Sequence, residues 1–365
     1  MKRRVLLAAM VLACMATGPV LAQEDPRALV EAARWKKARA LLEPKVKANP
    51  SDAEAAALLS QVRLAYGDGD GAISLAETAL KLDGNNAAYH WQLAKACGEQ
   101  ARKAGMFKGL SLVKRFRSEA DATLALDPKH IEARMYLISF YAGAPGIAGG
   151  DKKKAEQVAQ DVAKIDPAWG HLAHARLVEE TAEPKDNQAV AEREASYKKG
   201  LEAAKTPEAR YAALSGLVNL YLSPALENFD RAAVIARDMA AIDPPRVEPH
   251  LVLAIAYASG GKLAELDTAL AESEKVVPDS LGAYYQAGRV LFVRGTDYAR
   301  AEKYFRKFLT QEPGPGPSLA HAHWRLGMVL DKLDRKKEAI AEMEQALRLK
   351  PDLEEAKKEL KRLKG

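Results

Sequence analysis

Apolar residues recur along most of the chain at the spacing of amphipathic helices, and the predicted helices come in pairs. Residues 321–351 contain two such stretches, separated by a short charged turn at 332–337. Apolar residues every three to four positions lie on one face of each helix, so the two faces are expected to meet. Gly327 and Ala339 are small where the two backbones would approach most closely. Pro351 ends the second helix, because proline lacks the N–H group that a helix needs.

The same two-helix unit recurs along the chain, and each copy ends at a residue that stops a helix. These residues are Pro50, Gly84, Pro128, Pro167, Pro207, Pro244, Pro278, Pro313 and Pro351. Several follow the period of about 34 residues of the tetratricopeptide (TPR) repeat, whose pattern is W-x2-L-G-x2-Y…A-x3-F…P. Leu326, Gly327 and Ala339 occupy the Leu, Gly and Ala positions of that pattern. The Trp is displaced to Trp324, and Leu330 replaces the Tyr. The chain therefore resembles the TPR family nearly throughout.

The resemblance implies an all-α fold: a right-handed TPR superhelix (α-solenoid) of about nine helical hairpins plus a C-terminal capping helix. We expect a partial, capping hairpin at 23–50, the TPR array at 51–351 and the capping helix at 352–365. Pro44 is expected to end or kink the second helix of the first hairpin. The register of the hairpins ending at Pro207 and Pro244 stays open.

Two successive hairpins are longer than the period. Pro128 comes about ten residues later, and Pro167 about five residues later, than a 34-residue repeat predicts. The first excess is RKAGMFKGLSLVKRF at 102–116, before a second helix expected at 118–126. The second is AGAPGIAGG at 142–150. Both are expected in the turn between the two helices of a hairpin, and stacking places such turns side by side on one edge.

Composition and charge favour a helical protein without affinity for nucleic acid. Of the 365 residues, 48% are hydrophobic, 28% charged and 6% aromatic. The formal net charge is +6, but Lys2, Arg3 and Arg4 supply three of these charges in a segment without acids. The remaining charge of about +3 is too weak a bias to indicate nucleic-acid binding.

Residues 1–22 have the features of a secretory signal peptide, with a basic start, an apolar run and a small-residue cleavage site that ends at Ala22. The alternative is a lipoprotein signal, because residues 11–14 resemble a bacterial lipobox that would lipidate Cys14. Export to the periplasm is the preferred interpretation. No later stretch approaches about 18 consecutive apolar residues, so no transmembrane segment is expected after the signal.

In TPR proteins the first helices of the repeats line a concave groove, and repeat positions 5 and 9 point into it. The resemblance therefore implies a set of groove residues here. They are Trp91, Lys95, Met135, Leu251, Tyr285, Arg289, Trp324 and Met328. Aromatic and Met side chains bury large areas at interfaces, so a protein partner with an apolar or aromatic segment is expected. The alternative is that any of these side chains packs between adjacent repeats.

The two insertions form a second candidate site, for anions. Its residues are Lys103, Lys108, Lys114, Arg115, Arg117, Gly149, Gly150, Lys152, Lys153 and Lys154. The free N–H groups at a helix start near 152 favour anions, and the lysines add positive charge. An anionic lipid or envelope polymer is the partner that this edge would take. The alternative is a solvated charged surface.

No catalytic or metal-ligand pattern stands out. His171 and His174 share a helix face, and His321 and His323 are close in sequence, but no Cys or carboxylate completes a metal-ligand spacing. Cys97 has no recognisable base partner. We therefore predict an exported scaffold or adaptor, with neither enzyme activity nor cofactor, that binds a protein segment in its groove. Binding of an anionic lipid or polymer through the insertions is the alternative.

Overall fold

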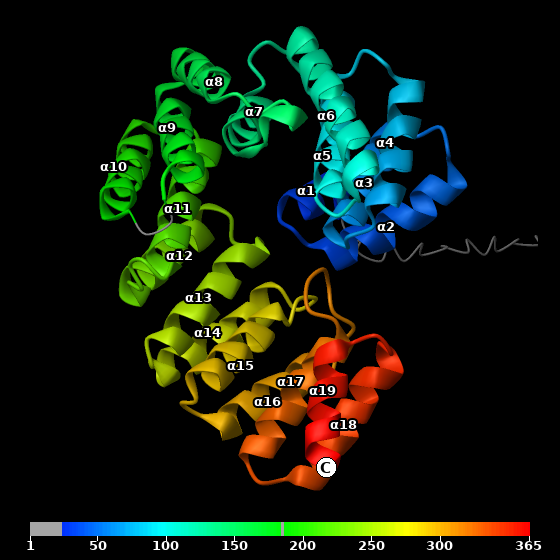
Figure 1. The fold of residues 1–365 in the computed structure, drawn as a ribbon, viewed down its shortest axis with the longest axis vertical. Helices are drawn as coiled ribbons and strands as arrows, with labels where there is room; N and C mark the ends of the chain where they lie inside the picture. The colour runs from blue at the N-terminus through cyan, green and yellow to red at the C-terminus, as the bar shows by residue number, and fades with distance from the viewer. Residues whose placement is uncertain (1–23, 184–185) are drawn as a thin grey trace, which may run out of the picture.

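The computed structural model describes residues 24–183 and 186–365 (Figure 1). The predicted signal peptide at 1–22 and Cys14 lie outside the described residues. Within the described part, the chain forms α-helices and one 3-10 turn and contains no β-strand. The all-α prediction is confirmed.

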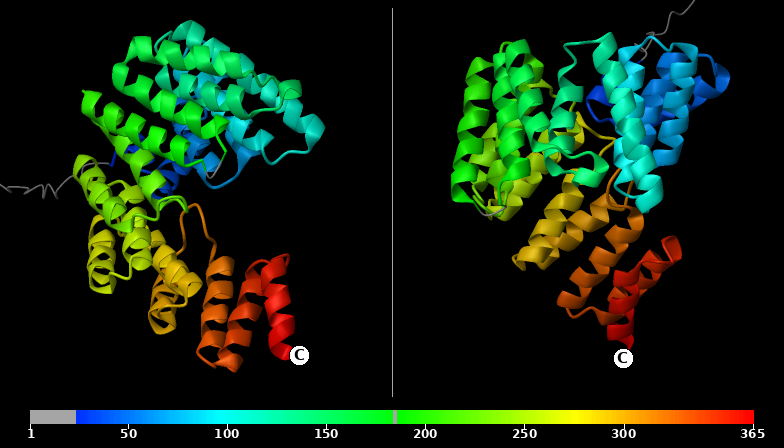
Figure 2. Two further views of the ribbon diagram at one scale, coloured as in Figure 1. Left: turned by 60° about the vertical axis from the view of Figure 1, so that its left-hand side comes forward. Right: turned by 45° about the horizontal axis from the view of Figure 1, so that its top comes forward.

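The helices follow one another as nine antiparallel hairpins, and α19 ends the array (Figures 1 and 2). The first helices of the hairpins are α1 (Pro26–Glu31), α3 (Ala53–Ala65), α5 (Ala87–Ala101), α7 (Ile131–Gly143), α9 (Pro167–Thr181), α11 (Pro207–Leu222), α13 (Val247–Ser259), α15 (Gly282–Arg294) and α17 (Leu319–Lys332). The second helices are α2 (Trp35–Ala48), α4 (Gly69–Leu82), α6 (Met106–Leu126), α8 (Lys152–Ile165), α10 (Asn187–Ala203), α12 (Phe229–Ile242), α14 (Leu263–Val276), α16 (Tyr298–Phe308) and α18 (Lys336–Leu349). The last helix is α19 (Glu354–Lys364), and the 3-10 turn η1 (Gly146–Ala148) precedes α8. The predicted solenoid of about nine hairpins with a terminal helix is confirmed.

Short polar side chains fix where many of these helices begin. Asp52, Asp68 and Asn86 each accept a hydrogen bond from a backbone N–H group in the first turn of the helix that follows. Asp166 does the same for α9, directly before a proline at the first helical position. These caps satisfy N–H groups that have no partner inside the helix, so the local sequence sets the helix boundaries.

Small residues let neighbouring helices approach closely. A Cβ atom added to Gly327 in α17 would lie 3.0 Å from the carbonyl oxygen of Ala339 in α18. A Cβ atom added to Gly170 in α9 would lie 2.6 Å from the Cα atom of Ala163 in α8. Backbone atoms cannot move aside as a flexible side chain can, so a larger residue would push the helices apart. The predicted close approach at Gly327 and Ala339 is confirmed.

Buried apolar side chains form a core that runs along the array. The largest cluster extends from Leu172 in α9 to Leu363 in α19, and separate clusters lie under the N-terminal hairpins. Tyr304 and Phe305 of α16 are among its largest fully buried side chains. α19 buries Ala356 and Leu363 and leaves most of its other side chains exposed, as a terminal repeat must.

The first insertion differs from the expanded turn that the sequence predicted. α6 begins at Met106 rather than near 118 and has 21 residues, so most of the extra residues lengthen the second helix of the hairpin. Phe116 in the added part is buried and packs edge-on against Phe140, with ring centroids 5.3 Å apart. This burial stabilises the helix, because tertiary packing rather than intrinsic propensity holds most protein helices together. The second insertion lies mostly in the turn between α7 and α8, as predicted, but its first two residues, Ala142 and Gly143, still belong to α7. The turn contains η1 and Gly149 at φ +99°.

Pro44 was expected either to end or to kink α2, and it does not end the helix. The helix continues to Ala48. Proline removes the hydrogen-bond donor for the carbonyl group of Ala40, but Ala40 is exposed, so water can bind that carbonyl group.

The N-terminal hairpin contacts hairpins far along the chain, so the solenoid closes on itself. The Nη2 atom of Arg246 donates to the carbonyl oxygen of Glu31 at 2.7 Å. The backbone N–H group of Val247 donates to the carbonyl oxygen of Ala32 at 3.2 Å. Arg34 pairs with Asp279, and the two side chains are only 7% and 10% exposed. We call this contact between α1–α2 and the C-terminal half the seam.

The loop before α17 extends the seam. This loop, drawn in orange, reaches toward the blue N-terminal helices (Figure 1). The Nζ atom of Lys36 donates to the carbonyl oxygen of Glu312 at 3.0 Å, and Arg39 pairs with the Glu312 carboxylate at 3.1 Å. The inserted residues 314–317, Gly-Pro-Gly-Pro, line a small cavity at the seam. The seam therefore combines one buried ion pair with several backbone contacts.

Replacing Asp279 with Asn should loosen the seam. Arg34 would keep a buried charge without a carboxylate, and breaking one side of a buried pair costs about 3–5 kcal/mol. We expect faster hydrogen exchange at the amides of α1 and α2. The double variant Arg34→Met/Asp279→Leu should restore much of the protection, because apolar groups replace the pair. Equal protection in the wild type and Asp279→Asn would show that the pair does not hold the hairpin.

Candidate functional site

The first helices of three successive hairpins, α5, α7 and α9, line a cavity of about 850 Å³ together with Val113 and Phe116 of α6. The start of the second insertion closes one end of it, through Ala144, Pro145 and Ala148. We call this cavity the α5–α7–α9 pocket. Its volume lies within the range of about 300–1,000 Å³ that is usual for ligand sites.

Aromatic side chains and small residues line the pocket. Tyr136 and Phe140 from α7 and Trp169 from α9 contribute rings, while Ser139 and Gly98 leave room between them. Tyr136 is 37% exposed, which is unusual for a large ring that lies between helices. Burial of the rest of this side chain raises the pKa of Tyr136. The wall of the pocket thus offers apolar area and one phenol hydroxyl group.

The pocket carries equal numbers of acidic and basic side chains. Its charged residues are Lys95, Arg102, Arg176, Glu99, Glu132 and Glu180. Lys95 pairs with Glu132 at 3.2 Å, and Arg102 with Glu99 at 3.3 Å. Such exposed pairs contribute only about 0–1 kcal/mol each, so a ligand can exchange partners with them at little cost. The balance of charges gives no strong preference for a cationic or an anionic ligand.

The predicted groove residues have different positions in the structure. Only Lys95 and Met135 of the eight line the α5–α7–α9 pocket. Trp91 is 3% exposed: its Nε1 atom donates to the Glu132 carboxylate at 2.7 Å, and its ring packs edge-on against Tyr136. The expectation that Trp91 presents its ring to a partner is therefore corrected, because its indole packs between α5 and α7.

Tyr285 requires the same correction. It is 6% exposed and packs against Phe305 and Phe308 of α16, with ring centroids 5.5 and 5.2 Å apart. The alternative of packing between adjacent repeats holds for Trp91, whereas the ring contacts of Tyr285 lie within its own hairpin. The repeat position of a residue does not show whether its side chain binds a partner or packs in the core, because both kinds of residue lie on the same face of the first helix.

The other four groove residues lie in the C-terminal half, away from the pocket. Leu251 lines the seam cavity together with Trp35 of the N-terminal hairpin. Arg289 donates to the Gln286 side chain at 2.9 Å. Trp324 and Met328 are half-buried against the main core, and the guanidinium group of Arg325 stacks 4.3 Å from the Trp324 ring. The structure does not join these residues to the α5–α7–α9 pocket.

Most residues of the α5–α7–α9 pocket were not predicted from the sequence. Tyr136 directly follows Met135, so an aromatic residue next to a groove position was the signal that the sequence offered. Trp169 belongs to the irregular hairpin that begins at Pro167, for which no groove positions were assigned. Phe140 lines the same cavity as Ala144, Pro145 and Ala148 of the second insertion, and only the tertiary structure shows that placement.

Two of the five cations predicted for the first insertion have acidic partners. Lys108 pairs with Asp70 of α4 at 3.1 Å, and Arg115 pairs with Glu77 of the same helix. Lys103 and Lys114 are exposed. The lengthened helix α6 therefore lies against an acidic face of the preceding hairpin, which neutralises part of the predicted anion site.

The two insertions do contact each other, as predicted. Arg117 of the first lies 5.7 Å from the ring of Tyr141 and beside Gly149 of the second. Lys154 lies 5.9 Å from the same ring and 3.9 Å from Asp151. A Cβ atom added to Gly150 would meet the Ala144 carbonyl oxygen, so this glycine serves a tight turn.

The start of α8 is already occupied by a carboxylate. Asp151 accepts a hydrogen bond from the N–H group of Lys154, which satisfies one of the donors that an anion would use. Lys152 and Lys153 remain exposed. A bound anion would have to compete with the Asp151 side chain, so the structure favours the alternative of a solvated charged surface here.

Three of the four histidines noted in the sequence have local partners. His174 contacts Glu192 at 2.8 Å, His323 contacts Glu342 at 2.6 Å, and His321 contacts Ser318 at 2.8 Å. In the part of the chain that the structure describes, no three His, Cys, Asp or Glu side chains gather as they would around a metal ion. Among the same residues, no helix combines the length and apolarity that crossing a membrane requires.

Comparison with known proteins agrees with the architecture. The family model of the tetratricopeptide repeat matches residues 27–97 and 285–354. These matches show tetratricopeptide repeats near both ends of the array, and the described hairpins between them have the same helical architecture. No curated protein sequence matches it.

Three solved structures are similar to it at low identity. The crystal structure of yeast Tom70 has 14% identity and a TM-score of 0.45, covering 93% of this chain and 80% of that one. A human IFIT1 dimer with PPP-AAAA has 15% identity and a TM-score of 0.44, covering 82% and 73%. A thermophilic TPR protein of Thermus thermophilus has 19% identity and a TM-score of 0.35, covering 63% and 94%.

Cys97 should be chemically inert in the folded protein. Its side chain is fully buried in α5, and burial raises the pKa of the thiol to about 11. The thiolate is the reactive form, so alkylation at neutral pH is expected only after denaturation. Peptide mapping after iodoacetamide treatment measures this at residue 97 separately from Cys14. Rapid alkylation of native protein at Cys97 would contradict the packing described for α5.

Proposed function

We propose that the protein is an adaptor that binds a segment of a partner protein in the α5–α7–α9 pocket. The observation that carries the proposal is a cavity of about 850 Å³ lined by exposed aromatic area on the first helices of successive hairpins. Tetratricopeptide repeats generally serve as non-catalytic scaffolds for protein interactions, and their groove lies on these helices.

The chemistry of the pocket defines the partner segment. Tyr136, Phe140 and Trp169 would bury an apolar or aromatic side chain, and such anchors dominate the energy of interfaces. The Lys95–Glu132 and Arg102–Glu99 pairs at the rim would bind polar groups of either sign. An extended segment with one aromatic or aliphatic anchor between polar residues fits this arrangement. Its backbone would occupy the room above Ser139 and Gly98.

The alternative partner, an anionic lipid or envelope polymer, has less support. Lys108 and Arg115 are paired with acids of α4, and Asp151 caps the helix start that an anion would use. Fewer free cations remain than the sequence suggested, and a few exposed lysines are usual on helical proteins.

We also propose export through the signal sequence at residues 1–22, with the mature chain in the periplasm. The proposal rests on the order of basic, apolar and small residues in that segment. Intact-mass measurement of the protein from its native cells should give a chain that begins at Gln23. A mass that includes a lipidated Cys14 would establish the lipoprotein alternative instead.

The partner site can be located by photo-crosslinking from the full-length chain. Benzoyl-phenylalanine placed at Tyr136 or Ser139 should crosslink one protein in cell extracts, and peptide mapping should identify an apolar or aromatic segment. The same probe at Val234 in α12, which is 60% exposed and remote from the pocket, is the matched control. The control should not crosslink that protein.

A second measurement gives the strength of the contact. With the identified segment as a synthetic peptide, Tyr136→Ala is expected to weaken binding by at least about ten-fold, since a hot-spot ring contributes about 2 kcal/mol or more. Val234→Ala should leave the affinity unchanged. Equal crosslinking from all three probe positions, or unchanged affinity in Tyr136→Ala, would overturn the proposed site.

A further inference from the structure

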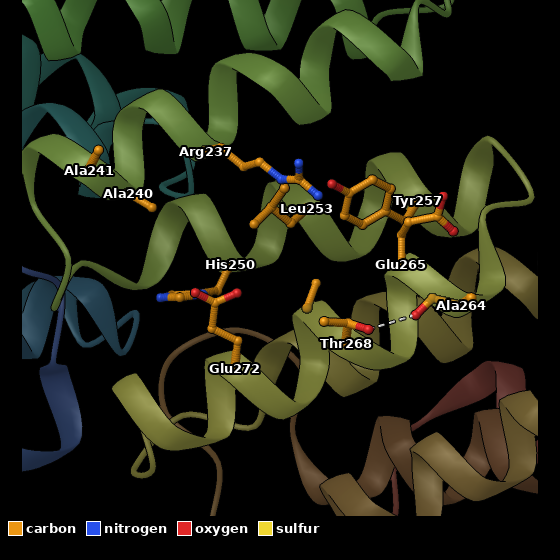
Figure 3. A pocket seen from close by; sticks show the side chains of 11 residues that line it. Arg237, Ala240, Ala241, His250, Leu253, Tyr257, Ala264, Glu265, Thr268 and Glu272 are labelled. Carbon is orange, nitrogen blue, oxygen red and sulfur yellow. Dashed lines mark hydrogen bonds between the residues drawn. The ribbon is translucent and has the colours of Figure 1, made fainter.

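A second cavity, of about 600 Å³, lies between α12, α13 and α14 (Figure 3). It shares no lining residue with the α5–α7–α9 pocket. Its floor is apolar and consists mainly of small side chains, including Ala240, Ala264 and Ala269, together with Leu253 and Tyr257. The cavity is therefore an independent candidate for ligand binding.

A buried histidine without hydrogen bonds lines this cavity. His250 of α13 is 5% exposed, and neither ring nitrogen forms a hydrogen bond of normal geometry within the described residues. Burial lowers the pKa of His250, while the nearby Pro244 carbonyl group and Glu272 oppose that shift. The ring is therefore neutral at physiological pH and offers one lone pair and one N–H group. Buried polar atoms in folded proteins nearly always have a partner, so the unpaired ring indicates a missing one.

The charged residues around the cavity are also unpaired. Arg237, Glu265 and Glu272 make no ion pair within 4.0 Å in the part of the chain that the structure describes. In Figure 3 the Glu272 side chain lies beside His250, whereas Arg237 and Glu265 lie near Tyr257. Arg237 stacks over the Tyr257 ring at 5.6 Å. The cavity thus has an acidic end at Glu272 and an electrically balanced end at Arg237 and Glu265.

Helix geometry gives the distance between the two ends. His250 and Tyr257 are two turns apart on α13, which corresponds to about 10 Å along the axis. Glu265 and Glu272 have the same spacing on α14. A ligand could therefore place a charged head at one end and several methylene groups over the apolar floor.

We propose that this cavity binds an ammonium group on an aliphatic stem, held between Glu272 and His250. The Glu272 carboxylate and the lone pair of the neutral His250 ring both accept hydrogen bonds, and a primary ammonium supplies three donors. A charged donor also gains more from such acceptors than a neutral one. Arg237 would repel the ammonium at the opposite end, which fixes the orientation. Free alkyl amines and lysine side chains of a protein share this chemistry.

The test uses the full-length protein and two probes. n-Pentylamine represents a free amine, and the peptide acetyl-Ala-Ala-Lys-Ala-Ala-amide represents a protein lysine. Titration is followed by the carbon-13 signals of the histidine rings, with His250 assigned through a His250→Gln variant. Saturable shifts of the His250 signal are expected with at least one probe. Tighter binding of the peptide would identify lysine as the source, and tighter binding of pentylamine a free amine.

Neutral probes and matched variants decide the outcome. n-Pentanol, or the peptide with norleucine in place of lysine, should bind at least ten-fold more weakly. Glu272→Gln should weaken amine binding at least ten-fold, whereas Glu265→Gln on the same helix should change it less than three-fold. An equal loss of amine affinity in both variants would mean that the amine is attracted by negative charge in general rather than by Glu272, and it would overturn the proposal. The absence of a saturable His250 shift with either amine, or equal binding of the neutral probes, would also overturn it.

Discussion

The structure depends on one constraint: no helical hairpin in this chain can bury its apolar face alone. Each hairpin therefore packs on the next, and small residues such as Gly170 and Gly327 set how closely the helices approach. The resulting core is nearly continuous from α9 to α19, and the apolar faces of the terminal helices still need a cover. At the C-terminus α19 supplies that cover with a mostly polar outer face.

The N-terminal end meets this constraint in a different way. The short α1–α2 hairpin is too small to form an extensive core, and it contacts the C-terminal half through Arg34, Arg246 and Glu312. This closure changes the surface available to a partner, because Leu251 then faces the seam rather than an open groove. Aromatic area from Tyr136, Phe140 and Trp169 lines the cavity between α5, α7 and α9. The seam and the proposed partner site thus lie on different segments of the same row of helices.

The two cavities also differ in what they offer to a ligand. The α5–α7–α9 pocket is aromatic, its charges balance, and two ion pairs already form at its rim. The cavity between α12, α13 and α14 has unpaired charges and a buried neutral histidine over an alanine-rich floor. The first arrangement suits an apolar side chain of a partner segment, and the second suits a single charged head group. An adaptor with both could engage two chemically distinct groups.

The sequence alone determined the fold class, the number of hairpins and the close approach of Gly327 and Ala339, because these follow from local periodicity and from residues that stop helices. It also showed that the two insertions are neighbours. It could not determine that α6 is lengthened, since the helical state of residues 106–117 depends on burying Phe116 against Phe140. Nor could it separate Trp91 and Tyr285, which pack between helices, from Tyr136, which lines a cavity. Positions on one helix face become core or binding surface only through the neighbours that stacking and ring closure bring to them, and those neighbours are far away in the sequence.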